Sequence, residues 1–124
     1  MVREIDPTTA SVFLKDNDAG LLFPVGYGKF YAYFTNGGEV LGIGELSVTG
    51  ISAKSRTLYV FPHARGKGVA TRLVKHRIAV ARNLGAAVFR ADCLVTSLKM
   101  YIREGAKVVR VCKNGVHKVE LALC

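Results

Sequence analysis

The sequence predicts a single α/β domain in which a sheet of about six to seven strands is flanked by two to three helices. Three observations predict it. A strand meander with a tight hairpin comes first, a helical period of 3.6 residues takes over near residue 69, and short apolar runs then return around one more helix. The 124 residues, half of them apolar, suffice for one core. Because no repeat or linker divides them, residues 1–124 are expected to form one domain.

The individual elements follow from local signals along the chain. Pro7 suits the first turn of a helix, Asn36-Gly37-Gly38 supplies a hairpin reversal, and Gly85 and Gly105 each end a helical pattern. Glycine, proline and Asx residues between 15 and 28 indicate a loop. The expected strands are residues 2–6, 29–35, 39–48, 55–61, 87–94, 107–112 and 116–123, and the expected helices are 7–14, 69–84 and 96–104.

Composition excludes several classes of protein. No apolar run reaches the roughly 18 residues of a membrane span, and three charged residues among the first six positions are unlike a signal peptide, so we expect a cytoplasmic protein that does not enter membranes. Cys93, Cys112 and Cys124 are odd in number and widely spaced. This pattern favours thiols in a reducing compartment over disulfides, and no cysteine, histidine or carboxylate grouping has metal-ligand spacing.

The net charge of +9 is concentrated in the second half of the chain. Residues 1–64 carry 5 Lys and Arg against 6 Asp and Glu, whereas residues 65–124 carry 13 against 3. Summed positive charge concentrates anions near a surface. The second half is therefore expected to face nucleic acid, a phosphate-bearing cofactor or an acidic protein.

The stretch LYVFPHARGKGVAT, residues 58–71, predicts a phosphate site at a strand-to-helix turn. The free N–H groups and the dipole of a helix N-terminus attract anions, and glycine lets a phosphate approach the backbone. Lys67 is followed by Gly68 rather than by Ser or Thr, which excludes a P-loop. None of the Gly-x-Gly pairs continues into the dinucleotide-binding pattern, so another phosphate-bearing ligand is favoured.

Two motifs resemble the signatures of a known family. Arg65-Gly66-Lys67-Gly68-Val69-Ala70 resembles the Arg/Gln-x-x-Gly-x-Gly/Ala signature of the GNAT superfamily of acyl-CoA-dependent N-acyltransferases. Residues 97–106, SLKMYIREGA, resemble its second signature of a small residue, Tyr, a basic residue and Gly. The resemblance covers about residues 29–123 and implies a mixed, V-split sheet that holds acyl-CoA between two splayed central strands.

The resemblance implies roles for particular residues. Backbone amides of the glycine turn and of the first helical residues would bind the pyrophosphate, Thr71 would add a donor, and Arg65 and Lys67 would add charge. The strand before the turn would pair with the pantetheine arm, with the Leu58 N–H near the thioester oxygen, and Tyr101 would protonate the departing sulfur. The implied cofactor site is Leu58, Tyr59, Val60, Arg65, Gly66, Lys67, Gly68, Val69, Ala70, Thr71 and Arg103, without a metal.

The general base is not given by the motifs. Where many relatives keep a glutamate, the strand that ends at Val60 has no carboxylate, which leaves Glu45, Asp92, His63 or an ordered water. Glu45 is our choice, because a strand residue facing the cleft could reach the amine directly or through water. The competing interpretation is a solvent-facing strand glutamate.

Four features depart from the family pattern. Arg77 falls in the apolar stripe of the long helix, where it either snorkels to the surface or pairs with Asp92. Gly105-Ala106 replaces the usual Gly-Phe, and Leu94 stands where asparagine is common. The helical region before residue 29 is also short, so the acceptor pocket is expected to be open or completed by a second subunit of a homodimer, which favours a large acceptor.

The resemblance implies a first function, and the basic charge of the chain allows an alternative. The first is an N-acetyltransferase that moves an acetyl group from acetyl-CoA to a primary amine by direct transfer through a tetrahedral intermediate, with an unknown acceptor such as a protein or an aminoacyl-tRNA. The alternative is a basic nucleic-acid-binding module, or a catalytically inactive GNAT-fold binding or regulatory protein. Aromatic residues interleaved with Lys29 could stack bases, although strand alternation also explains them.

Overall fold

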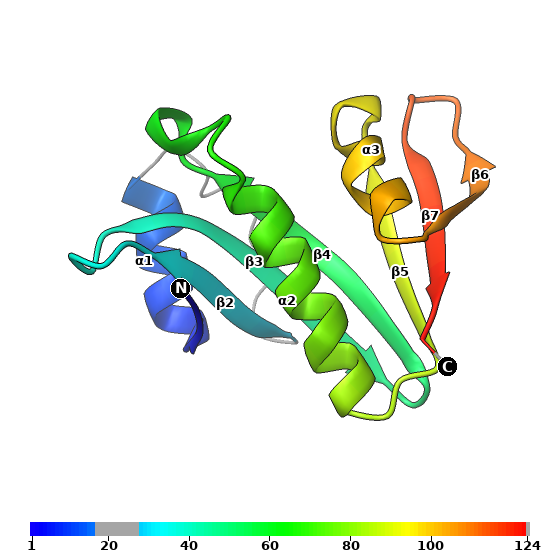
Figure 1. The fold of residues 1–124 in the computed structure, drawn as a ribbon, viewed down its shortest axis with the longest axis horizontal. Helices are drawn as coiled ribbons and strands as arrows, with labels where there is room; N and C mark the ends of the chain where they lie inside the picture. Colours follow the sequence, from blue (N-terminus) through cyan, green and yellow to red (C-terminus); the bar gives the residue numbers. More distant parts are fainter. Residues whose placement is uncertain (17–27, 124) are drawn as a thin grey trace.

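A computed structural model describes residues 1–16 and 28–123, which form one seven-stranded mixed sheet with the strand order β1-β2-β3-β4-β5-β7-β6 (Figure 1). Neighbouring strands are antiparallel except for β4 and β5, which are parallel. The strands are β1 (Val2–Ile5), β2 (Lys29–Phe34), β3 (Val40–Thr49), β4 (Ser52–Val60), β5 (Val88–Cys93), β6 (Lys107–Val111) and β7 (His117–Ala122). The helices are α1 (Pro7–Asp16), the 3-10 turn η2 (Pro62–Ala64), α2 (Val69–Asn83) and α3 (Val95–Arg103).

The sheet splits between its two parallel strands. Pairing of β4 with β5 joins only Ser52–Ser55 to Val88–Ala91, although β4 continues to Val60 and β5 to Cys93. Figure 1 shows the two strands diverging from a shared base near the C-terminus, with α2 beside one arm and α3 beside the other. The expected V-split sheet is confirmed, and its opening lies between the ends of β4 and β5, which no longer pair with each other.

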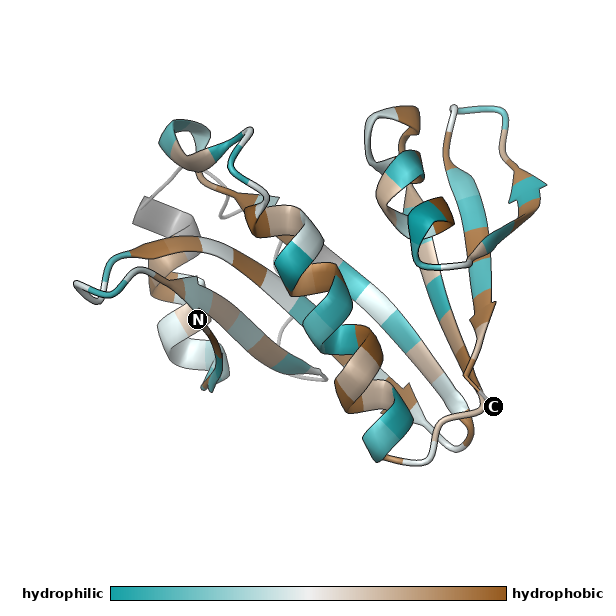
Figure 2. Ribbon diagram, viewed as in Figure 1, coloured by the Kyte–Doolittle hydropathy of each residue, from teal (hydrophilic) through white to brown (hydrophobic). Residues whose placement is uncertain are grey.

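Helix α2 packs closely on the first arm of the sheet. Its buried residues recur at helical spacing, and its hydropathy alternates in bands along the ribbon (Figure 2). Two glycines of β3 allow this approach. A Cβ at Gly42 would lie 2.9 Å from the Val69 side chain, and one at Gly44 would lie 3.0 Å from the Nε atom of Arg77.

The opposite face of the same arm has its own smaller core. Ala10 of α1 packs there with Phe30 and Ile43, while Tyr31, the next residue along β2, belongs to the core under α2. This alternation is the period of two that a strand covered on both faces requires. Both faces of the first arm are therefore apolar and fixed, which makes it a rigid support for the edge that borders the split.

Most sequence-based boundaries are confirmed within one or two residues, and β4 is the main difference. It begins at Ser52, three residues before the expected start, because the turn at Gly50 (φ +60°) returns the chain directly into pairing with β3. The loop expected at 15–28 falls largely outside the described residues, although Lys15 and Asp16 belong to α1. No helix within the described ranges is long and apolar enough to cross a membrane.

Candidate functional site

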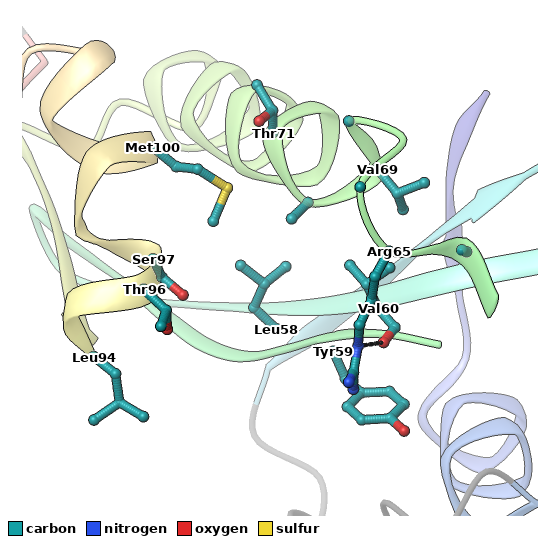
Figure 3. A pocket seen from close by; sticks show the side chains of 14 residues that line it. Leu58, Tyr59, Val60, Arg65, Val69, Thr71, Leu94, Thr96, Ser97 and Met100 are labelled. Carbon is teal, nitrogen blue, oxygen red and sulfur yellow. Dashed lines mark hydrogen bonds between the residues drawn. The ribbon is translucent and has the colours of Figure 1, made fainter. Parts of the chain in front are cut away.

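A cavity of about 650 Å³ opens between the arms of the sheet, beside the N-terminus of α2 (Figure 3). One wall is the end of β4 with the turn that follows it, and the other is α3. Its lining residues are Leu58, Tyr59, Val60, Ala64, Arg65, Gly66, Gly68, Val69, Ala70, Thr71, Leu94, Thr96, Ser97 and Met100. The cavity thus joins both motifs singled out in the sequence.

The glycine turn presents the start of α2 to this cavity. Gly66 and Gly68 have φ angles of +79° and +80°, which side chains strongly disfavour, and a Cβ on either would meet nothing within 4 Å. Gly68 is the N-cap of α2, and no side chain caps the helix. The first N–H groups of a helix lack partners within it, so this end offers donors and positive potential to an anion.

Near the cavity, beyond Ser55, β4 is paired with β3 and no longer with β5. Gly44 pairs with Leu58 and Leu46 pairs with Ser55, so Glu45 on β3 faces two residues of β4, which form a bulge. The bulge turns the strand just before Leu58, at the point where the split opens.

A second cavity of about 450 Å³ adjoins this bulge and is lined by Arg56, Leu58, Asp92, Cys93, Leu94, Ser97 and Tyr101. It shares three of its lining residues with the first cavity, namely Leu58, Leu94 and Ser97. Tyr101 is only 3% exposed, and its hydroxyl lies 3.3 Å from the Ser55 Oγ. The two cavities together run from the glycine turn to a phenol, a continuous path across the split.

Comparison with known proteins identifies the architecture. The sequence profile of the acetyltransferase (GNAT) family matches residues 3–104. The chain belongs to the GNAT family of acetyltransferases. A search of curated proteins gave no match.

Solved structures agree with this GNAT fold over nearly the whole chain. The ribosomal-protein-S18-alanine N-acetyltransferase from Escherichia coli has a TM-score of 0.80 at 13% identity, covering 99% of this chain and 93% of that one. Rv2747 from Mycobacterium tuberculosis, in complex with CoA, has a TM-score of 0.78 at 18% identity, with 100% and 99% covered. The structure of yncA from Salmonella typhimurium with its cofactor acetyl-CoA has a TM-score of 0.77 at 18% identity, with 100% and 94% covered.

In this GNAT domain, nine of the eleven residues expected to bind the cofactor line the first cavity. Arg65 does so while its Nε donates to the Val60 carbonyl at 3.0 Å and its guanidinium lies 5.6 Å from the Tyr59 ring centroid (Figure 3). Lys67 and Arg103 line neither cavity. Both are exposed, so they remain predictions as cofactor contacts.

Both sequence-based interpretations of Arg77 are wrong. The side chain is fully buried rather than snorkelling. It donates to the Leu73 carbonyl at 3.2 Å, to the Glu45 carbonyl at 3.0 Å and to the Ser55 Oγ at 2.5 Å. Burial lowers the pKa of Arg77, whereas interactions with Tyr101 and Glu45 raise it. Its expected partner Asp92 instead contacts Lys54 and Lys118.

Glu45 is buried, so the interpretation as a solvent-facing strand glutamate is wrong. It lines neither cavity. Its carboxylate lies next to Gly28, where an added Cβ would come within 2.5 Å of Oε2. The carbonyl of the same residue accepts from Arg77, and the charge of its carboxylate raises the pKa of that guanidinium, so Glu45 is coupled to the Tyr101 cluster through Arg77.

The other candidates for a base have separate environments. Asp92 lies at the rim of the second cavity, and although burial opposes it, hydrogen bonds and charge from Lys54 and Lys118 lower the pKa of its carboxyl. His63 is exposed and contacts Glu39 at 3.2 Å, away from both cavities. Burial and the nearby Asp92 raise the pKa of the Cys93 thiol, which suits a buried structural thiol more than a nucleophile.

Sequence reasoning assigned no role to several residues of the site. Ser97 and Met100 line the first cavity from α3, near Tyr101, whose role as the acid was expected and which lines the second cavity. Their i, i+3 and i+4 spacing places them on one face of a helix and could have indicated a shared wall. Ser55 carried a weaker signal. It lies two residues after Ala53 on the same face of β4, and both residues are buried.

Within the ranges that the structure describes, no cluster of three or more His, Cys, Asp or Glu side chains could hold a metal ion.

Proposed function

We propose that this GNAT domain binds acetyl-CoA across the two cavities and transfers its acetyl group directly to a primary amine. The observation that carries the proposal is the path that joins the α2 N-terminus, at Gly66 and Gly68, to the phenol of Tyr101. The relatives solved with CoA and acetyl-CoA support the choice of cofactor. The pyrophosphate would lie at the helix N-terminus, and the thioester would lie toward Tyr101.

Each step of the transfer has a candidate group. The pantetheine arm would pair with the edge of β4 that borders the split, between Leu58 and Val60. The amine would attack the thioester carbon, and the Leu58 N–H beside the bulge would stabilise the oxyanion of the tetrahedral intermediate. On collapse the C–S bond breaks, and the Tyr101 hydroxyl gives its proton to the sulfur.

Glu45 is retained as the proposed base that takes the proton of the attacking amine, directly or through water. The buried backbone of Glu45 is linked by Arg77 to Ser55, which lies beside Tyr101. Its carboxylate points toward Gly28 instead, so an amine approaching from that side, or a water chain, would have to connect the two. We therefore expect kcat to depend on the Glu45 carboxylate.

The acceptor is proposed to be an acidic macromolecule, either a protein or an aminoacyl-tRNA. Helices α2 and α3 contain no acidic residue and carry Arg72, Lys75, Arg82, Lys99 and Arg103 on exposed positions. Lys75 alone among them forms an ion pair with an acid in the described part of the chain, with Glu104 at 3.0 Å. Such a surface would attract polyanions and repel polycationic amines.

One experiment tests the function as a whole. The protein is incubated with radiolabelled acetyl-CoA and a panel of basic and acidic proteins, aminoacyl-tRNAs and polyamines, and the labelled product is identified. We expect label on an acidic protein or on aminoacyl-tRNA. If CoA binds but no amine in the panel is labelled, the catalytically inactive alternative is favoured; if CoA does not bind, the proposed cofactor site is wrong.

With the labelled acceptor, Tyr101→Phe tests the acid. We expect kcat to fall by about 10²-fold or more, the usual contribution of a general acid, while the affinity for CoA stays within about twofold. Steady-state kinetics and calorimetry give the two values. Normal turnover by Tyr101→Phe would remove the acid assignment and leave the cofactor site intact.

The matched test of the base is Glu45→Gln. The substitution keeps the side chain's size and removes its ability to accept a proton, so kcat should fall by a similar factor while thermal unfolding confirms the fold. An unchanged rate and pH profile would instead point to water or to Asp92.

A further inference from the structure

A chain of hydrogen bonds connects the middle of α2 to the phenol at the end of the second cavity. Arg77 Nη1 donates to the Ser55 Oγ at 2.5 Å, and that oxygen lies 3.3 Å from the Tyr101 hydroxyl. The residues come from α2, β4 and α3, and the three side chains are 0%, 4% and 3% exposed, respectively. The chain therefore crosses the base of the split in a setting where polar interactions are strong.

The donor capacities of these groups fix one end of the chain. An arginine side chain can only donate, so the Ser55 oxygen acts as acceptor toward Arg77. Because a hydroxyl oxygen has two acceptor sites, either hydroxyl can donate in the contact between Ser55 and Tyr101. In one of the two arrangements, the single Ser55 proton is donated to the Tyr101 oxygen. With that oxygen accepting from Ser55, the proton of Tyr101 itself is left to be donated into the cavity that the phenol lines.

Burying the Arg77 cation at this place costs folding free energy, so its presence calls for an explanation. Removing a charge of this size from water costs several kcal/mol, and an apolar side chain often fills such a position at no loss of stability. The protein nevertheless accommodates Arg77 by having a glycine at position 44, where a Cβ would lie 3.0 Å from the Nε atom of Arg77. The fold thus makes room for a guanidinium beneath the second cavity.

We propose that Arg77 is a positioning residue that acts through Ser55 to aim the proton of Tyr101 at the CoA sulfur and to stabilise the phenolate that remains. This inference rests on the proposed function, in which Tyr101 is the acid. As the S–H bond forms and the O–H bond breaks, negative charge develops on the phenolic oxygen. The Ser55 hydroxyl donates to that oxygen, and the fixed charge of Arg77 polarises the donor.

Other charged and titratable groups near the phenol are differently placed. Arg56, Asp92 and Cys93 share the second cavity with Tyr101. Asp92 is held by Lys54 and Lys118. Glu45 lies beyond Arg77 and acts on the arginine, since its charge favours the protonated guanidinium. Arg77 is the cation that donates a hydrogen bond to Ser55, the partner of Tyr101.

The test needs no acceptor and compares CoA with CoA that lacks its sulfur atom. Calorimetry is done at about pH 9, near the range in which thiols ionise, so a hydroxyl aimed at the sulfur strengthens the binding of CoA and not that of the sulfur-free analogue. In the wild type we expect CoA to bind about tenfold more tightly than the sulfur-free analogue, the usual effect of a hydrogen bond to a charged group. Tyr101→Phe should abolish this ratio.

Arg77→Met and Ser55→Ala should each reduce the ratio to roughly twofold while leaving the affinity for the sulfur-free analogue unchanged within about twofold. Arg77→Lys, which keeps the cation, should retain a larger ratio than Arg77→Met. Thermal unfolding checks the fold of each variant. If Arg77→Met does not fold, Ser55→Ala carries the test, because it breaks the chain and leaves Arg77 on the Glu45 carbonyl.

The outcomes separate this inference from the function on which it rests. A ratio that is lost in Tyr101→Phe but kept in Arg77→Met and Ser55→Ala overturns the role of Arg77 and leaves Tyr101 as the acid. Equal ratios in the wild type and Tyr101→Phe overturn the acid and the relay together. Failure of the wild type to bind either molecule overturns the cofactor site itself.

Discussion

The glycines of the turn before α2 show what a single residue contributes to this site. Gly68 has a φ of +80°, a conformation that favours a residue without a side chain, and it also lines the cofactor cavity. Gly50, in the turn between β3 and β4, has a φ of +60° and lines neither cavity. The two positions share the backbone requirement and differ only in their location, which makes Gly50 a control for Gly68.

Gly68→Ala and Gly50→Ala should therefore separate stability from binding. Each should lower the free energy of unfolding by about 1–2 kcal/mol, the cost of a left-handed conformation with a Cβ. Gly68→Ala alone should also weaken CoA binding, by roughly tenfold, because its methyl group enters the space expected for phosphate. Denaturant unfolding and calorimetry measure the two effects. Equal CoA affinities in both variants would mean that the turn does not hold the cofactor.

At the same scale, sequence could predict the turn but not the buried cluster. Gly66, Gly68 and the start of α2 are contiguous, so local rules on helix ends suffice to predict an anion site. Arg77 depends instead on acceptors from β3 and β4 and on the space left by Gly44, none of which is near it in sequence. Its position in the apolar stripe gave the correct face, and only the tertiary contacts explain why an arginine is there.

At the scale of elements, the boundaries that sequence predicted well are those with a chemical signal at the end. Gly85 follows α2 with a φ of +83°, and Gly105 follows α3 with a φ of +101°. The start of β4 lacked such a signal, since Ser52 and Lys54 are polar and their pairing with β3 and β5 comes from the sheet. The bulge that turns β4 toward the site likewise exists only in the register of two strands.

Helix α1 has a signal at its start that can be tested by pH. The Asp6 carboxylate accepts from the Thr9 N–H and from the Thr9 hydroxyl, each at 2.8 Å, and these bonds lower the pKa of Asp6 from its ordinary value of 3.8. A lowered pKa in the folded state means that ionised Asp6 stabilises the fold above about pH 4 and loses this effect as pH falls through the folded-state pKa.

Asp6→Asn should consequently lose less thermal stability than the wild type between about pH 7 and pH 3, because asparagine caps a helix without titrating. Melting temperatures of both proteins across this range measure the difference, and Asp6→Ala shows the loss of the cap at every pH. Parallel pH curves for the wild type and Asp6→Asn would show that the carboxylate does not stabilise α1 in its ionised form.

At the scale of the whole molecule, the proposed cofactor connects two arms that the sheet joins only at their base. The cavity takes its walls from β4 and α2 on one arm and from α3 on the other. Acetyl-CoA in that position would contact both arms, so it should stabilise the protein against unfolding as a unit. The net charge of +9 could also stabilise the protein in the presence of an anion, by general attraction that does not depend on the cavity.

Thermal unfolding with and without CoA distinguishes these two effects. At a CoA concentration about 100 times its Kd, binding to the folded state adds about 2.7 kcal/mol, which corresponds to a rise in Tm of roughly 10 °C for a domain of this size. Arg65→Glu should reduce that rise by more than half and leave the Tm without CoA nearly unchanged, since Arg65 is exposed and lines the cavity. Lys113→Glu makes the same change of charge in the exposed turn between β6 and β7, outside both cavities. It should keep the full rise, and an equal loss in the two variants would show that net charge rather than the cavity holds CoA.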